Sequence, residues 1–197
     1  MTLYLVRHGQ TEENLQHILQ GHMPGTLTAK GREQMRQAAR QLAGSGVGYR
    51  CIVSSDLRRA MDSAEIIAEE LGLPVVPMEI LRERNWGCYT GMPVSEAADR
   101  FKVNGKWCFP DVRLDQQNPE VRLDQQVRLG QQVPETDEGI YERARKALAL
   151  LAEQYADDNI IVVTHGQFAR NLIAAHFDCS YHEVTPFVNA EVRQLTL

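Results

Sequence analysis

Two histidines occupy similar positions, each at the end of a short apolar run and each followed by a glycine. His8 follows Arg7, and His165 follows Thr164. In an open parallel sheet, ligands bind beyond the carboxyl ends of the strands, so we expect both rings to face one crevice. The glycines let backbone approach a ligand closely, and the start of a following helix offers amide donors. This arrangement is typical of a site that binds an anion.

Arginines and one carboxylate extend the pattern. Arg7 belongs to the first motif, and Arg58 and Arg59 open a predicted helix whose positive end reaches the same crevice. A phosphate monoester carries about two negative charges near neutral pH, and planar guanidinium groups bind its oxygens in pairs. Glu83 follows a third strand-like run, and its carboxyl can protonate a leaving oxygen. Together these residue types predict phosphoryl-transfer chemistry.

Short apolar runs predict the strands that must hold these side chains. The first two runs are short and mainly apolar, which is typical of buried strands whose two faces are both covered. The strongest is β-branched at every position. The predicted strands are Leu3 to Val6, Tyr49 to Val53, Val75 to Val76, Ile160 to Val163 and Glu191 to Leu197.

Between these runs, apolar residues recur at helical spacing. The first helix is predicted to begin after Thr28 and to stop at Gly44, and the second to open at Ser55 or Asp56 and close at Gly72. Strands that alternate with helices predict an α/β protein with a mainly parallel sheet. The apolar positions mark helices over about 29–43, 57–71, 140–151 and 166–177.

A longer motif surrounds His8: Leu5-Val6-Arg7-His8-Gly9-Gln10-Thr11, followed by Asn14. It resembles the signature of the histidine phosphatase superfamily, the phosphoglycerate mutase-like family. Further blocks arrive in the family's order and leave only about 103–133 uncovered. They are Gln20-Gly21, Leu27-Thr28-x-x-Gly31, Ser54-Ser55-Asp56-Leu57-x-Arg59-Ala60, Leu81-Arg82-Glu83-x-x-x-Gly87 and Val163-Thr164-His165-Gly166. The resemblance implies a three-layer α/β/α sandwich around a mainly parallel central sheet.

The resemblance also implies roles for individual residues. Neutral His8 would attack phosphorus to form a phosphohistidine, and Glu83 would protonate the leaving oxygen and later activate water. Positioning and electrostatics supply the catalysis, and no metal or cofactor is implied. The implied catalytic residues are His8, Glu83, His165, Arg7 and Arg59, and the implied substrate-binding residues are Asn14, Gln20, Gly21 and Gly166.

Two positions depart from the family's pattern. Tyr89-Thr90-Gly91 stands where the family often has Trp-Glu-Gly, and Pro134-Glu135-Thr136 stands where it often has Gly-Glu-Ser. Those positions tend to contact substrate, so the pattern defines the chemistry better than the substrate. The Leu-x-Arg-Ala spacing selects Arg59 for the pocket and predicts that Arg58 faces solvent.

Other residues receive simpler interpretations. His17 and His22 lie in the polar loop after the first motif and are predicted to be surface residues rather than substrate contacts. Trp86 is interpreted as a packing residue, as aromatic side chains usually are.

The length of 197 residues favours one domain spanning 1–197. One segment breaks the α/β order. The hexapeptide Val112-Arg113-Leu114-Asp115-Gln116-Gln117 recurs at 121–126 and, with one change, at 127–132. Three such short units cannot form a solenoid, so we predict a repetitive insertion at about 112–132, either a lid or a tolerated surface loop.

Composition restricts the partners. The net charge of −5 offers no broad basic field for nucleic acid or an anionic membrane, so a small phosphorylated substrate is expected. The four cysteines form no Cys-x-x-Cys pair, which argues against a zinc site. No signal peptide or membrane span is evident, so a cytoplasmic protein is expected, and a homo-oligomer is left open.

Three functions remain in competition. The first is a phosphomonoesterase acting on a small phosphorylated metabolite. The second is a phosphoglycerate mutase, which must keep its phosphohistidine from water; mutases of the family are typically longer, so the phosphatase is favoured. The third is a phosphate-binding protein that has lost catalysis, which the presence of every implied catalytic residue argues against.

Overall fold

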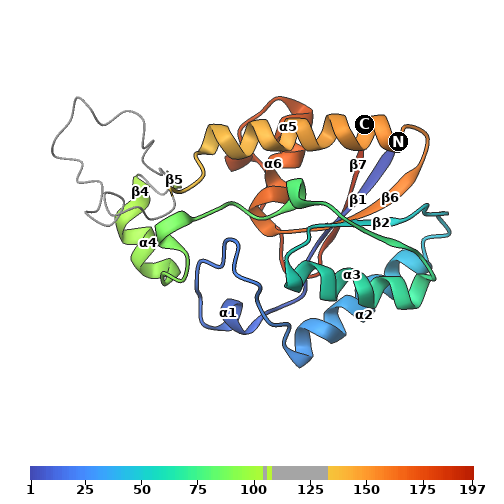
Figure 1. Cartoon of the computed structure of the whole chain (residues 1–197), viewed down its shortest axis with the longest axis horizontal. Helices are drawn as coiled ribbons and strands as arrows, with labels where there is room; N and C mark the ends of the chain where they lie inside the picture. Colours follow the sequence, from blue (N-terminus) through green and yellow to red (C-terminus); the bar gives the residue numbers. More distant parts are fainter. Residues whose placement is uncertain (104–105, 108–132) are drawn as a thin grey trace.

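The computed structural model describes residues 1–103, 106–107 and 133–197 (Figure 1). Its main sheet has five strands in the order β3-β2-β6-β1-β7. All neighbours are parallel except β1 and β7, which are antiparallel. The strands are β1 (Thr2–Arg7), β2 (Ile52–Ser54), β3 (Val75–Pro77), β6 (Asn159–Thr164) and β7 (Val192–Thr196). The predicted mainly parallel sheet is confirmed, and its antiparallel strand lies at one edge.

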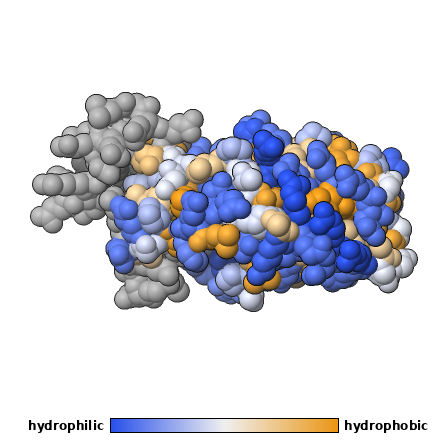
Figure 2. Space-filling view, turned by 90° about the horizontal axis from the view of Figure 1, so that it is seen from below, coloured by the Kyte–Doolittle hydropathy of each residue, from blue (hydrophilic) through white to orange (hydrophobic). Residues whose placement is uncertain are grey.

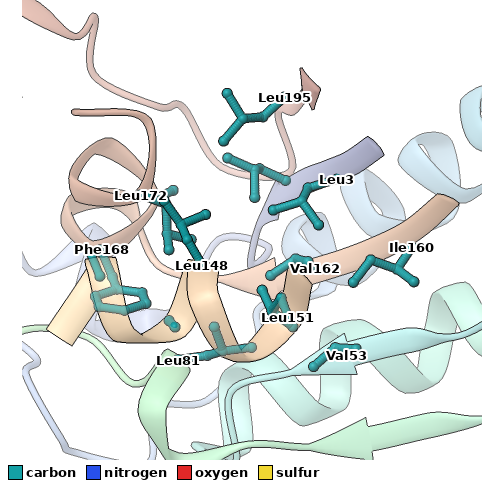
Figure 3. Packing of buried hydrophobic residues seen from close by; sticks show 14 of the residues in the cluster. Leu3, Val53, Leu81, Leu148, Leu151, Ile160, Val162, Phe168, Leu172 and Leu195 are labelled. Carbon is teal, nitrogen blue, oxygen red and sulfur yellow. The ribbon is translucent and has the colours of Figure 1, made fainter. Parts of the chain in front are cut away.

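Helices cover both faces of this sheet, so the predicted three-layer α/β/α architecture is confirmed (Figure 1). Helices α5 (Asp137–Gln154) and α6 (Gly166–Phe177) cover one face, and α2 (Ala29–Ala43) and α3 (Arg58–Leu71) cover the other. Strand β6 contributes side chains to both layers, because successive side chains of a strand point to opposite faces of the sheet. Ile160 and Val162 pack under α5 and α6, as Figure 3 shows, while Ile161 and Val163 pack against α2 and α3.

Local capping explains where the predicted helices begin and end. The Thr28 hydroxyl accepts a bond from the amide of Gly31, and Gly44 closes α2, as predicted. The start of α3 was predicted at Ser55 or Asp56, but its N-cap is Leu57, which makes no side-chain cap bond. Ser55 is engaged elsewhere, because its hydroxyl accepts from the amide of Leu57 and pairs with a histidine ring.

Smaller elements lie in the connections and were not predicted. Two of them flank the segment that carries Glu83, and α4 extends toward the edge of the described region (Figure 1). The repetitive insertion predicted at 112–132 lies outside the described residues, so it stays a prediction. These elements are α1 (Glu12–Leu15), η1 (Glu79–Leu81), η2 (Gly87–Tyr89), α4 (Val94–Phe101), β4 (Lys102–Val103), β5 (Lys106–Trp107) and η4 (Tyr181–Glu183).

The exposed surface on the side of α2 and α3 is mostly hydrophilic (Figure 2). Figure 2 shows hydrophilic residues over most of the face that carries α2 and α3, with apolar areas scattered between them. Across the described ranges, no helix combines the length and the apolarity that crossing a bilayer requires.

The pairing of β1 with β6 aligns the two histidine motifs. Arg7 lies opposite Thr164 in the parallel register, so the residues that follow them leave the sheet side by side. Two glycines then allow α2 to approach this point. A Cβ on Gly31 would lie 2.1 Å from the carbonyl oxygen of Gln10, and one on Gly9 would lie 2.5 Å from the carbonyl oxygen of Gly31. Backbone therefore packs directly on backbone behind His8.

We predict that Gly31→Ala destabilises the fold even though Gly31 lies in a helix. Replacing a helical glycine by alanine ordinarily gains about 1 kcal/mol, but the clash with Gln10 should reverse the sign and leave a net loss of about 1–3 kcal/mol. Urea denaturation of the purified variant measures this. Gly48→Ala is the control, because a Cβ on Gly48 would meet nothing within 4 Å. Equal stability of both variants would contradict the packing argument.

Candidate active site

The two motif histidines meet at the carboxyl ends of β1 and β6. Their ring centroids lie 5.2 Å apart with the planes tilted by 60°. Both rings are buried, with 3% of His8 and none of His165 exposed. The two rings predicted to face each other at the strand ends therefore do lie together, in a buried position.

Hydrogen bonds fix the tautomer of His8. Its Nδ1 lies 2.8 Å from the carbonyl oxygen of Gly9, and because a carbonyl can only accept, Nδ1 carries the proton. The lone pair of a neutral ring then lies on Nε2. Arg59 donates from Nε to that atom over 3.3 Å. The nucleophilic nitrogen of His8 thus faces a guanidinium group, and a phosphoryl group bound there would meet both.

The environment keeps both histidines neutral. Burial lowers the pKa of His8 well below 6.5, and the charges of Arg59 and Arg7 lower it further. Burial likewise lowers the pKa of His165, with Arg59 as the next largest cause. A positive ring would lose its hydration and face nearby cations. At neutral pH, His8 therefore keeps the lone pair that nucleophilic attack requires.

Arg7 and His165 each have a buried nitrogen that no described residue binds. Arg7 donates from Nη1 to the carbonyl oxygen of Phe187 over 2.6 Å, but its buried Nε has no partner among the described residues. His165 pairs through Nε2 with the Ser55 hydroxyl at 2.8 Å, and its buried Nδ1 is similarly unpaired. Buried polar atoms without partners are rare and are typical of a site that awaits a ligand.

The loop after α1 holds Arg59 in place. Arg59 donates from Nη2 to the carbonyl oxygen of Gly21 over 2.8 Å and from Nη1 to that of Met23. Burial lowers the pKa of Arg59 to about 10, so the group remains a cation at neutral pH. Gln20 is also buried, and its Oε1 is unpaired in the described part of the chain. Gly21, predicted to bind substrate, acts here through its carbonyl as a support for Arg59.

Asn14 is held by its amide oxygen. That oxygen accepts from the Thr11 amide and from Nδ2 of Asn189, both over 3.1 Å. The same Asn189 nitrogen donates to the carbonyl oxygen of His8 over 3.1 Å. The oxygen is thus occupied twice, while the NH2 group of Asn14 makes no hydrogen bond to another of the described residues. Asn189 lies outside the family motif and is 181 positions from His8, so its role could not be predicted from the sequence.

Glu83 is bound to the start of α6. Its Oε1 accepts from the amides of Phe168 and Arg84 over 3.0 and 2.9 Å, and its Oε2 accepts from the amide of Gln167 over 3.2 Å. The field of this carboxylate reaches both pocket arginines, since it acts on the pKa values of Arg7 and Arg59. Glu83 therefore lies at the edge of the pocket, held by backbone donors.

The absence of a side chain at Gly166 leaves room for the guanidinium group of Arg7. A Cβ there would lie 3.2 Å from Nε of Arg7. Gly166, predicted to bind substrate, therefore allows Arg7 to pack against the first turn of α6. This close approach brings the unpaired Nε of Arg7 to the same helix end that holds Glu83.

Several simpler expectations can be compared with the structure. The Arg58 side chain is 74% exposed, so its predicted exposure is confirmed. His17 is exposed as predicted, whereas the surface prediction for His22 is wrong. His22 is half-buried, and its Nε2 donates to the carbonyl oxygen of Glu83 over 2.9 Å. Trp86 packs with Tyr89 in a small apolar cluster, as interpreted.

Glu135 and Thr136 stand at positions that tend to contact substrate in the family, but in this chain both side chains bind protein groups. The Glu135 carboxylate is paired with Arg143 at 2.8 Å, and the Thr136 hydroxyl caps α5 by accepting from the Gly139 amide. Both side chains are thus occupied within the protein.

Across the described ranges, no three His, Cys, Asp or Glu side chains gather closely enough to hold a metal ion.

Comparison with known proteins identifies the family. The sequence model of the histidine phosphatase superfamily (branch 1) matches residues 3–197. The chain belongs to this superfamily. Within the histidine phosphatases, it is 32% identical to the phosphatase PhoE of Bacillus subtilis over 82% of this chain and 70% of PhoE. It is 31% identical to phosphoglycerate mutase-like protein 4 of Arabidopsis thaliana, over 86% of this chain and 68% of that protein.

A solved histidine phosphatase structure supports the same placement. The fold is similar to that of a mycobacterial glucosyl-3-phosphoglycerate phosphatase in complex with VO3, with a TM-score of 0.75 and 26% identity. The similarity covers 99% of this chain and 90% of that one. The family resemblance inferred from the motifs is therefore confirmed.

We predict that the free energy of unfolding falls as the pH drops below about 6.5. The unfolded chain binds protons on His8 and His165 below that pH, whereas the folded chain, with lowered pKa values, does not. Each buried histidine contributes a slope of up to about 1.4 kcal/mol per pH unit. Urea denaturation at pH 7.5 and 5.5 measures the loss, which His165→Asn should reduce. His17→Asn, which removes an exposed histidine, should leave it unchanged; equal losses in all three proteins would contradict the assignment.

Proposed function

We propose that this histidine phosphatase family member is a phosphomonoesterase that hydrolyses a small phosphorylated metabolite through a phosphohistidine on His8. The observation that carries the proposal is the state of His8. Its ring is buried and neutral, its proton is on Nδ1, and its Nε2 lone pair faces the cation of Arg59. A nucleophile of this kind suits attack on an anionic phosphorus centre, because the cation neutralises charge on the phosphoryl oxygens.

Binding uses the donors that the protein leaves unpaired or can redirect. Nε of Arg7 and Nδ1 of His165 have no partner among the described residues. The NH2 group of Asn14 makes no hydrogen bond within the same part of the chain, since its bonds there use the amide oxygen. Together with Arg59, these groups surround the equatorial oxygens of the transferred phosphoryl group. Their burial raises the strength of each contact, since water does not screen the charges.

The reaction then proceeds in two steps. Nε2 of His8 attacks phosphorus, the bond from phosphorus to the ester oxygen breaks, and protonated Glu83 gives its proton to the departing oxygen. In the second step, ionised Glu83 takes a proton from water, and the hydroxide attacks the phosphohistidine to release phosphate and neutral His8. The acid of the first step is thereby the base of the second, and the carboxyl returns to its starting state.

A phosphoglycerate mutase is the alternative that a specific observation favours, because relatives at about 30% identity carry mutase names. The two reactions share the first step and differ in the acceptor of the phosphoryl group. A phosphatase transfers it to water, and a mutase returns it to a hydroxyl. Phosphate release from a panel of phosphorylated metabolites, compared with transfer between phosphoglycerates in the same preparation, distinguishes them.

We predict that His8→Ala abolishes phosphate release, because no other side chain is placed to carry the phosphoryl group. His165→Ala should slow turnover while still forming some intermediate. The assay uses purified protein in the presence of a chelator, with wild type expected to remain active. His17→Ala, which removes an exposed histidine, is the matched control. Rapid quench with labelled substrate should trap label on His8 that mild acid removes; acid-resistant label, or none, would exclude the covalent route.

We predict that Glu83→Gln slows alkyl phosphates far more than an aryl phosphate. An alkoxide needs a proton to depart and a phenolate does not, so loss of the general acid should cost about 10²- to 10⁴-fold on the alkyl substrate. Steady-state kcat on both substrates measures the effect. Glu79→Gln is the control, because that carboxylate is exposed and its ion pair within the described residues is with Arg82. Equal losses on the two substrates would assign Glu83 to binding or structure instead.

A further inference from the structure

The segment that carries Glu83 has no regular backbone structure of its own. Glu83 lies between η1 and η2, and residues 82–86 belong to neither helix nor strand. Three backbone amides bind the carboxylate itself, but no ladder of backbone hydrogen bonds fixes the segment that carries it. The position of this segment depends on groups that bind it from outside.

Arg143 of α5 supplies two of those bonds and a third to Ile80 of η1. It donates from Nη1 to the carbonyl oxygens of Ile80 and Arg82 over 2.9 and 2.7 Å, and from Nη2 to that of Glu83 over 3.3 Å. Its remaining donors, on Nε and Nη2, bind the two carboxylate oxygens of Glu135 over 2.8 Å each. A guanidinium group has five N–H donors, so every donor of Arg143 is in use.

Glu135 binds the other side of the same segment. Its Oε2 accepts from the amide of Asn85 over 3.2 Å, and its own amide donates to the carbonyl oxygen of Asn85 over 2.7 Å. Its carbonyl oxygen accepts from Nε of Arg84 over 2.8 Å. Glu135 and Arg143 thus bind the backbone or side chain of every residue from 82 to 85.

Arg143 also touches the structure that holds the carboxyl itself. Its guanidinium carbon lies 4.2 Å from the centre of the Phe168 ring, and the Phe168 amide donates to Oε1 of Glu83. The Phe168 side chain is fully buried. The same guanidinium group therefore contacts both the backbone of Glu83 and the residue whose amide donates to its carboxylate.

We propose that Arg143, held in orientation by Glu135, is a positioning residue for the general acid Glu83. The proposal rests on the proposed function. Arg143 is not itself a catalytic residue, since its donors all bind protein groups. It sets the distance between the Glu83 carboxyl and the leaving oxygen, and a displacement of about 1 Å at such a distance can cost about 100-fold in rate. Positioning of this kind requires the planar fork of arginine rather than its charge alone.

The test is Arg143→Lys, which keeps the positive charge and loses the fork. On an alkyl phosphate, kcat should fall by about 10- to 100-fold, while on an aryl phosphate it should change by less than about threefold, since a good leaving group needs no proton. Arg145→Lys is the matched control. Arg145 lies on the same helix but makes an exposed ion pair with Glu142, so both rates should stay unchanged.

The double variant decides between positioning and general damage. In the Glu83→Gln background, Arg143→Lys should cause no further loss on the alkyl phosphate, because the acid it positions is already absent. A further loss of tenfold, equal losses on both substrates in the single variant, or no loss at all would each overturn the proposal. Where Arg143→Lys does not fold, as judged by circular dichroism, Glu135→Gln is measured by the same criteria.

The controls separate this inference from the function on which it rests. If Glu83→Gln itself shows no dependence on the leaving group, the general-acid role fails and the proposed function is wrong in that step. If Glu83→Gln shows the dependence and neither Arg143→Lys nor Glu135→Gln does, only the positioning role fails.

Discussion

A buried guanidinium next to a buried imidazole imposes the chemistry of this site. Arg59 has 1% of its surface exposed and donates to the ring nitrogen of His8, so a proton on that nitrogen would put two positive charges in contact without water between them. The ring must remain neutral. The buried Arg59 cation then needs other acceptors for its N–H groups, and the carbonyl oxygens of Gly21 and Met23 accept from it. The nucleophile and the loop that wraps Arg59 are in this way parts of one electrostatic arrangement.

The site also depends on the pairing of the two longest parallel strands, β1 and β6. Strands β1 and β6 each run for six residues and leave the sheet at the same level, which delivers both histidine rings to one point. A shift of register by one residue would turn every side chain of the strand to the opposite face. Since Leu3 and Leu5 are packed under α5 and α6 while Val6 packs against α2, the two cores fix the register and with it the site.

Local patterns in the sequence were sufficient for the elements and for the residues that follow strands. The apolar runs and the caps of α2 are properties of neighbouring residues, and the family motif named the histidines and arginines that the structure brings together. What the sequence analysis missed depends on contacts between distant segments. Asn189 reaches His8 across the sheet, and His22 reaches the Glu83 backbone, with no local signal for either bond.

The hydrogen bonds that Phe187 and Asn189 make to the first motif have a consequence for biosynthesis. Phe187 and Asn189 bind Arg7 and His8, and β7 pairs with β1 as the sheet edge. A ribosome makes the first motif long before it makes these partners, so the nascent chain carries its nucleophile without an assembled site while the residues between them are synthesised. Contacts between such distant positions are slow to form because the intervening chain must first be ordered. A chain that stops short of residue 187 would retain the motif in its sequence and lack the geometry on which the chemistry depends.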